Sequence, residues 1–278
     1  MRSLHQPGPV HSRRIDSFGG IAETLSFPSR TGVTLLEAVT GPLVDAAWRG
    51  GTLTMTSGAL NPFRYVMPGP PDNASHVAYF SPPRAPEGTT RIELANATFG
   101  WHDGQPYLHC HAAWIEPDGA RRGGHILTSD SIVTEPVIVQ AWGFRAIEIA
   151  TSLDQETNFT LFQPSGPSDA NAPAVAARVR PNVDIVTAVE TIARLHGMPN
   201  ARIRGSLGSL IGTCFVDGTM VPDDATEVLV RGGHVTDGKA KLRLLVVDAQ
   251  GNVHEGELAR GENPVCITFD LVLTSNDR

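Results

Sequence analysis

The feature that most constrains the fold of this chain is an internal repeat. Residues 183–208 align without gaps on residues 33–58. Identical residues fall at Val33/Val183, Ala38/Ala188, Val39/Val189 and Gly58/Gly208, and Asp103-Gly104 recurs as Asp237-Gly238. A helix, a glycine-containing strand, a Glu-bearing strand and an Asp-Gly turn are therefore expected in the same order twice. Two diverged copies of one domain explain this recurrence better than a single large fold.

A segment of linker-like composition separates the two copies. Residues 163–180 (QPSGPSDANAPAVAARVR) are rich in Pro, Ala, Ser and Asn, which is typical of a connecting segment. With 278 residues the chain has room for two domains of ordinary size. We expect a first domain at residues 1–165, a linker at 166–180 and a second domain at 181–278.

The best helix of the first copy runs from Val33 to Trp48. Its apolar residues recur at helical spacing, and Thr34 followed by Glu37 three positions later has the pattern of a capping box. Gly41-Pro42 lies inside this pattern. Because proline lacks the amide donor and clashes with the preceding turn, we expect it to break or kink the helix.

A β-hairpin is predicted from Tyr107 to His125. The segment before Pro117-Asp118-Gly119 alternates in polarity and is rich in β-formers, and the return strand begins at Gly123. Alternation places His109 and His111 on one face and Cys110 on the opposite, buried face. If the strands pair around this turn, His125 lies near the other two histidines.

Three imidazoles on one face predict a divalent metal site. Neutral imidazole is a ligand of zinc and also of iron and similar ions, and three protein ligands leave an open position, as in catalytic zinc sites. Zinc is the metal that we expect first. The alternative is that some of these histidines are ordinary core or interface residues. The second copy has Arg243, Leu244 and Leu245 in place of the His-x-His pair, so we expect no second site there.

The hairpin sequence LHCHAAWIEPDGARRGGHIL resembles the signature of the PPC domain (plants and prokaryotes conserved, also called DUF296). The second half, through GSLGSLIGTCF, resembles a degenerate copy. The resemblance implies an α+β fold: two tandem PPC-like domains, each a mostly antiparallel β-sheet packed with one main helix. It also implies assembly into homotrimers, here of two-domain chains, and a divalent metal on His109, His111 and His125. The Pro-rich insertion at residues 61–88 departs from the family pattern, and we expect it to cover the metal site.

Charge and hydropathy restrict the partners. The formal net charge is −7, whereas non-specific nucleic-acid binding requires a basic face. The minor-groove Arg-Gly-Arg-Pro motif of plant members of the family is absent. The sequence shows no apolar run long enough for a membrane span and no secretion signal. We therefore expect a cytoplasmic protein without membrane contact and disfavour DNA as its partner.

Two functions fit these observations. In the first, which we favour, the chain is a metal-dependent enzyme that acts on a small anionic metabolite by hydrolytic, lyase or decarboxylase-type chemistry. In the second, it is a non-catalytic, DNA-associated or transcription-regulating scaffold with a structural metal. Candidate proton-transfer and substrate-anchoring residues for the first are Glu135, Arg64, Tyr65, His76 and Tyr79. Each of these five also fits ordinary surface or core packing.

Overall fold

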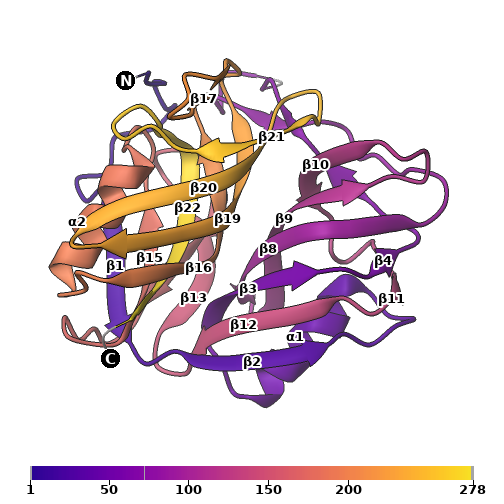
Figure 1. The fold of residues 1–278 in the computed structure, drawn as a ribbon, viewed down its shortest axis with the longest axis horizontal. Coiled ribbons are helices and arrows are strands. Elements are labelled where there is room, and N and C mark those ends of the chain that lie inside the picture. The colour runs from indigo at the N-terminus through magenta and orange to yellow at the C-terminus, as the bar shows by residue number, and fades with distance from the viewer. Residues whose placement is uncertain (1, 72, 277–278) are drawn as a thin grey trace.

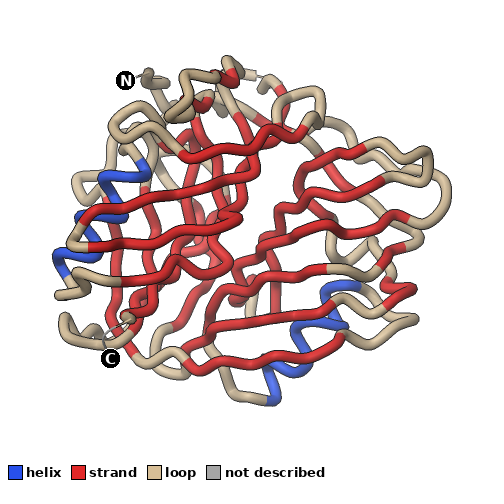
Figure 2. Tube along the Cα trace, in the orientation of Figure 1, coloured by secondary structure: helices blue, strands red, loops and turns tan. Residues whose placement is uncertain are grey.

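The protein consists of two β-sheets packed face to face, each with one helix on its outer side (Figures 1 and 2). The computed structural model describes residues 2–71 and 73–276. Most strand pairs are antiparallel, so the chain has the expected α+β composition. Within the described residues, neither helix is long and apolar enough to cross a membrane.

The first sheet is built from residues 23–165 and has eleven strands. Its main path runs β2-β12-β3-β8-β9-β10-β5. The strands are β2 (Glu23–Pro28), β3 (Gly50–Thr56), β4 (Ala59–Leu60), β5 (Tyr65–Val66), β8 (Thr90–His102), β9 (Gln105–Ile115), β10 (Arg121–Ile126), β11 (Val133–Glu135), β12 (Ile138–Phe144), β13 (Glu148–Leu153) and β14 (Thr160–Ser165). A separate two-stranded sheet joins β6 (Pro68–Gly69) to β7 (Tyr79–Phe80).

Helix α1 (Leu35–Asp45) packs on the outer face of this sheet. The expected capping box is confirmed: the Thr34 hydroxyl accepts from the Glu37 amide, and the Glu37 carboxylate accepts from the Thr34 amide. The expected break at Gly41-Pro42 is wrong, since the helix continues through Pro42. Only the one backbone bond that Pro42 would donate is lost, and Leu43 beyond it is fully buried in the core, which holds the last turn in place.

The second sheet has seven strands, and helix α2 (Ile185–Leu195) covers its outer face. Its order is β1-β15-β22-β16-β19-β20-β21. The strands are β1 (Ile15–Gly20), β15 (Ala174–Val179), β16 (Ala201–Leu210), β19 (Thr226–Thr236), β20 (Lys239–Val247), β21 (Val253–Glu257) and β22 (Val265–Ser275), and a small ribbon pairs β17 (Thr213–Cys214) with β18 (Met220–Val221).

The two halves repeat one chain path. In each, a strand leads into the helix, and the following strands lie in the same spatial order: β2-β12-β3-β8-β9-β10 in the first sheet and β15-β22-β16-β19-β20-β21 in the second. The Asp-Gly turns have matching backbone angles, with φ of 49° at both Asp103 and Asp237 and 74° at both Gly104 and Gly238. Such left-handed pairs form the tight turn that matches strand twist.

Two segments depart from the expected boundaries. Strand β15 lies inside the range expected to be a linker, and all six of its residues are buried. Its run of Ala and Val suits a strand covered on both faces. Strand β1, near the N-terminus, pairs with β15 and joins the second sheet. The N-terminal segment therefore belongs spatially to the second half.

Alternation along the strands decides which side chains meet between the sheets. On β8, Ala95, Ala97 and Phe99 pack in the core beneath α1, so Asn96 and Thr98 face the second sheet. The Asn96 amide group donates to the carbonyls of Ser206 and Val230 at 3.0 and 2.8 Å. These buried bonds join the two sheets, with an apolar cluster beside them.

Candidate metal centre

The predicted hairpin is confirmed and brings the three histidines together. Strands β9 and β10 pair antiparallel, and His125 lies directly opposite His111. His109, His111 and His125 each offer a ring nitrogen, and these nitrogens lie within 4.8 Å of one another. Cys110 between them points the other way and is fully buried, as its strand position predicts. All three imidazoles lie on the face of β9 and β10 that meets the second sheet.

Contacts on the far side of two rings fix their tautomers. Nδ1 of His111 lies 3.1 Å from the carbonyl oxygen of Val228, and Nδ1 of His109 lies 3.2 Å from Oδ2 of Asp270. Both partners are acceptors, so each Nδ1 carries the proton and each Nε2 presents a lone pair. Such outer contacts orient metal-binding histidines. Both partners come from the second half of the chain.

The two Nε2 atoms of His109 and His111 lie 3.1 Å apart. With both Nδ1 atoms protonated, this contact joins two lone pairs and is repulsive unless a cation lies between them. Two nitrogens bound to one tetrahedral zinc, at about 2.0–2.1 Å each, are separated by roughly 3.3 Å. The observed separation therefore suits shared coordination of one ion.

Burial keeps the imidazoles of His111 and His125 neutral. Desolvation first, and then the neighbouring His109 and His125, hold the pKa of His111 well below its usual range. Desolvation and the neighbouring His109 lower the pKa of His125 to about 3. Neutral imidazole is the form that binds metal. These two residues are therefore ready to coordinate a cation at neutral pH without first losing a proton.

Glu227 on β19 completes the centre from the second half. Its Oε1 lies 3.7 Å from Nε2 of His111, and its side chain is almost fully buried. Burial raises the pKa of the Glu227 carboxyl well above its usual range. Among the described residues, neither Oε2 of Glu227 nor Nδ1 of His125 has a hydrogen-bond partner. A buried polar atom without a hydrogen-bond partner lowers the unfolding free energy by about 1–3 kcal/mol. A bound cation would give such atoms a partner. The donor set therefore fits a divalent metal.

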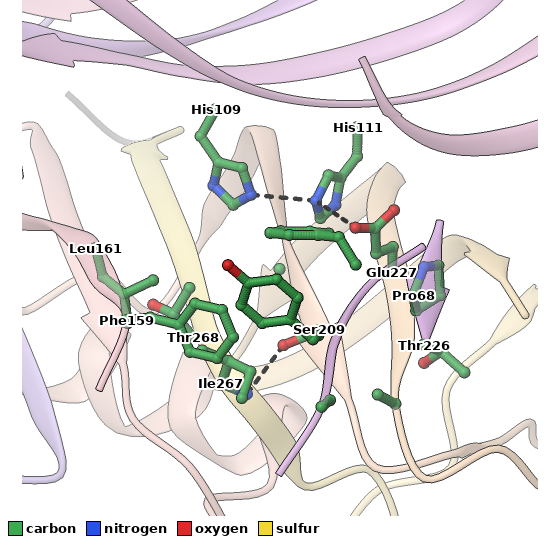
Figure 3. A pocket seen from close by; sticks show the side chains of 15 residues that line it. Pro68, His109, His111, Phe159, Leu161, Ser209, Thr226, Glu227, Ile267 and Thr268 are labelled. Carbon is green, nitrogen blue, oxygen red and sulfur yellow. Dashed lines mark hydrogen bonds and ion pairs between the residues drawn. The ribbon is translucent and has the colours of Figure 1, made fainter. Parts of the chain in front are cut away.

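A cavity of about 80 Å³ adjoins the imidazoles of His109 and His111 (Figure 3). Figure 3 shows His109 and His111 projecting toward it, with Glu227 beside His111. Its lining is mostly apolar, and the polar side chains at its wall, apart from these three, are hydroxyls. None of the described residues that line it is Lys or Arg. Aromatic and aliphatic lining comes from Tyr79, Phe80, Phe159, Leu161 and Ile267, and hydroxyls come from Ser209, Thr226 and Thr268.

The Pro-rich insertion at residues 61–88 covers the site, as expected. Pro68, Ala78, Tyr79 and Phe80 from this segment line the cavity. The Phe80 ring meets the His125 ring edge-on, with centroids 5.3 Å apart. The insertion therefore limits access of water to the imidazoles.

The five candidate catalytic residues lie in different places. Tyr79 lines the cavity, and His76 lies just behind it, in ring contact with Tyr79 and Phe159. Tyr65 is in the core, where its hydroxyl donates to Glu116 at 2.9 Å.

Arg64 and Glu135 lie on the surface. The Arg64 side chain is exposed, and Glu135 forms an exposed ion pair with Arg91 at 2.7 Å. Neither borders the cavity. The strand pairing of β11 with β4 turns Glu135 outward.

Sequence reasoning missed Glu227 and Asp270. Direct alignment pairs Glu227 with Glu93, but the strand register pairs it with Leu94, since Leu94 lies opposite Ala113 as Glu227 lies opposite Val247. Only the packing of the two sheets shows that Glu227 faces His111. No sequence pattern distinguishes Asp270.

Comparison with known proteins gives structural neighbours only. No family model and no curated protein matches the chain. A plant- and prokaryote-conserved (PPC) protein from Pyrococcus horikoshii is similar, with 14% identity over 56% of this chain and 97% of its own, at a TM-score of 0.39. A metal-containing protein from Archaeoglobus fulgidus has 15% identity over 54% of this chain and 99% of its own, at 0.41. A candidate DNA-binding protein from Bacteroides thetaiotaomicron has 12% identity over 54% and 98%, at 0.39. The neighbours thus include a protein of the family that the sequence resembles, and each matches about half of the chain.

Proposed function

We propose that this chain is a metal-dependent enzyme of the lyase or hydrolase type that acts on a small molecule bearing a carboxylate or carbonyl oxygen. In this proposal His109, His111 and His125 hold one divalent cation, zinc in the first instance. The observation that carries the proposal is the buried Glu227 carboxylate, 3.7 Å from Nε2 of His111, beside a cavity. A cation, when bound, polarises an oxygen of the substrate or of water.

The residues of the chain have separate tasks in this proposal. Glu227 accepts a proton from the substrate or from water and returns it, because a carboxylate with a raised pKa suits both steps. Asp270 and the Val228 carbonyl hold the imidazoles in their ligand tautomers. Phe80 and Tyr79 keep bulk water away, which strengthens charge interactions at the site.

The cavity narrows the substrate class. Its volume of about 80 Å³ holds only a few non-hydrogen atoms, given that one water needs about 10–15 Å³ on the same scale. Without a described Lys or Arg at the wall, an anionic substrate has only the cation as its charge partner. We therefore expect a small substrate with one anionic group and an otherwise apolar body.

A panel of small carboxylic acids and carbonyl compounds in D₂O tests this proposal. Deuterium exchange or turnover, followed by proton NMR, is expected with zinc-loaded protein and not with Glu227→Gln or with the triple His→Ala variant. The control is Glu93→Gln, which removes a carboxylate that pairs with Arg121 and Arg231 and does not line the cavity. Equal activity of Glu227→Gln and wild type would contradict the proposal.

A second candidate function is favoured by the same carboxylate. If Glu227 acts as a fourth ligand, the metal has no open coordination position, as in structural zinc sites. The chain is then a non-catalytic scaffold, and DNA is the partner to test. Glu227→Gln would then lose metal and thermal stability together. Retained metal with lost turnover would favour the enzyme.

The repeated chain path supports a further part of the proposal. We infer two PPC-like domains from tandem duplication, with the second formed by residues 174–276 together with strand β1. Assembly of the chain into trimers and a cytoplasmic location belong to the same proposal. Light scattering after size-exclusion chromatography tests the trimer, and a monomeric mass would contradict it.

A further inference from the structure

A row of basic side chains crosses the second sheet outside the metal centre. Arg202 on β16 lies opposite His234 on β19, and His234 lies opposite Lys241 on β20. Residues directly opposite each other in antiparallel strands project from the same face. Adjacent strands are about 4.8 Å apart, so the three side chains form a line about 10 Å long.

This row has one acidic partner among the described residues. Arg202 has no ion pair with any described residue, and Lys241 has only Glu257, at 3.8 Å. The chain as a whole is acidic, with a net charge of −7, so this row is a local concentration of basic side chains. An anionic ligand would give Arg202 an ionic partner.

The row borders an open groove of about 530 Å³, which Arg243, Asn276 and the carboxylate of Glu257 also line. The side chains of Lys241 and Arg243 are both 63% exposed. No described segment covers this face.

The matching face of the first half is covered. The repeat counterpart of His234 is Gly100, where an added Cβ would lie 2.3 Å from the Ile149 carbonyl oxygen and 2.6 Å from the Phe162 ring. The hairpin of β13 and β14 thus lies on this part of the first sheet. Among its described residues, the second half has no such hairpin and has basic residues in its place.

We propose that this groove is a second binding site, for a small ligand that carries two or more phosphate groups. Arg202 and Lys241 bind the outer phosphates, and His234 between them contributes a ring nitrogen. Paired or chained phosphates match a line of cationic donors better than a single anion does. The groove volume suits a small molecule, and the acidic net charge disfavours a long nucleic acid. This site is independent of the proposed catalytic function.

Calorimetric titration of the full chain with inorganic pyrophosphate and tripolyphosphate tests the proposal. Arg202→Gln/Lys241→Gln is expected to bind tripolyphosphate about tenfold or more weakly than wild type, because charged hydrogen bonds are lost. Arg30→Gln removes an exposed arginine from the first half and is expected to bind as wild type does. Orthophosphate is expected to bind more weakly than either chain phosphate.

Three outcomes would overturn the proposal. Equal affinity of the double variant and wild type would place the phosphates elsewhere, including at the histidine centre, which this variant leaves intact. Equal weakening in Arg30→Gln would indicate general charge attraction. Tighter binding of a single-stranded oligonucleotide than of tripolyphosphate, lost in the double variant, would assign the groove to nucleic acid.

Discussion

The carboxylate of Glu227, on β19 of the second sheet, lies 3.7 Å from Nε2 of His111, on β9 of the first. The two residues belong to different halves of the chain and meet only because the sheets pack face to face. A site that the hairpin alone would leave open on one side is thereby enclosed by the second half. The half without its own histidines therefore still contributes to the centre.

Replacement of Glu227 by Gln should separate proton transfer from metal binding. If the three imidazoles hold the cation, zinc affinity measured by chelator competition should change by less than about tenfold, while turnover should fall by about 10²–10⁴-fold. Glu93→Gln should change neither. A loss of zinc affinity larger than a hundredfold would instead make Glu227 a ligand.

Replacement of Asp270 by Asn should weaken metal binding although Asp270 does not reach the cation. The charged acceptor of the His109 Nδ1 proton is replaced by a neutral amide, which is a weaker acceptor, and such outer contacts contribute about 10–100-fold to metal affinity. Asp248→Asn is the matched control, since Asp248 pairs with His254 at 2.9 Å and lies outside the cavity lining. Equal zinc affinity in both variants would argue against the orienting role of Asp270.

Asp154 should make the fold sensitive to acid. Burial opposes its ionisation, but Arg178, the Thr157 amide and Arg180 outweigh this and lower the pKa of Asp154 to about 2. The carboxylate contacts Arg178 and Arg180 at 2.9 and 2.6 Å. Because the folded-state pKa is depressed, this stabilisation is present above about pH 4 and is lost as the pH falls toward 2. It amounts to roughly 2 kcal/mol of the unfolding free energy.

Urea denaturation of wild type and Asp154→Asn at several pH values measures this effect. The variant removes the ion-pair partner of buried Arg178 and one of the two partners of Arg180, which keeps Asp16 at 3.0 Å, so its unfolding free energy at pH 7 should fall by about 3–5 kcal/mol. Between pH 4 and 2 its stability should decline less than that of the wild type. Parallel pH profiles would show that another group carries the acid sensitivity.

Local signals in the sequence sufficed for the elements closest to the site. The Thr34 cap, the Asp-Gly turns and the alternation around Cys110 each depend on neighbours a few residues away, and each is observed. The same alternation places His109 and His111 on one face. This is why the cluster of imidazoles could be predicted without a structure.

Contacts between distant segments could not be predicted. The Ala/Val run of β15 resembles a linker in composition, and only its pairing with β1 and β22 makes it a strand. Register also changes the comparison of the halves: Leu245 pairs with Glu255 as His111 pairs with His125. The counterpart of His125 is therefore Glu255. Direct alignment of Gly124 with Gly256 would instead pair His125 with Glu257.

The metal content of purified protein tests the central claim most directly. Plasma mass spectrometry on untagged wild type, supplied with zinc, should find about one ion per chain. The triple variant His109→Ala/His111→Ala/His125→Ala should contain none while circular dichroism shows the same β-rich fold. Absence of metal from the wild type, or equal metal in the folded variant, would contradict a metal centre built on these three histidines.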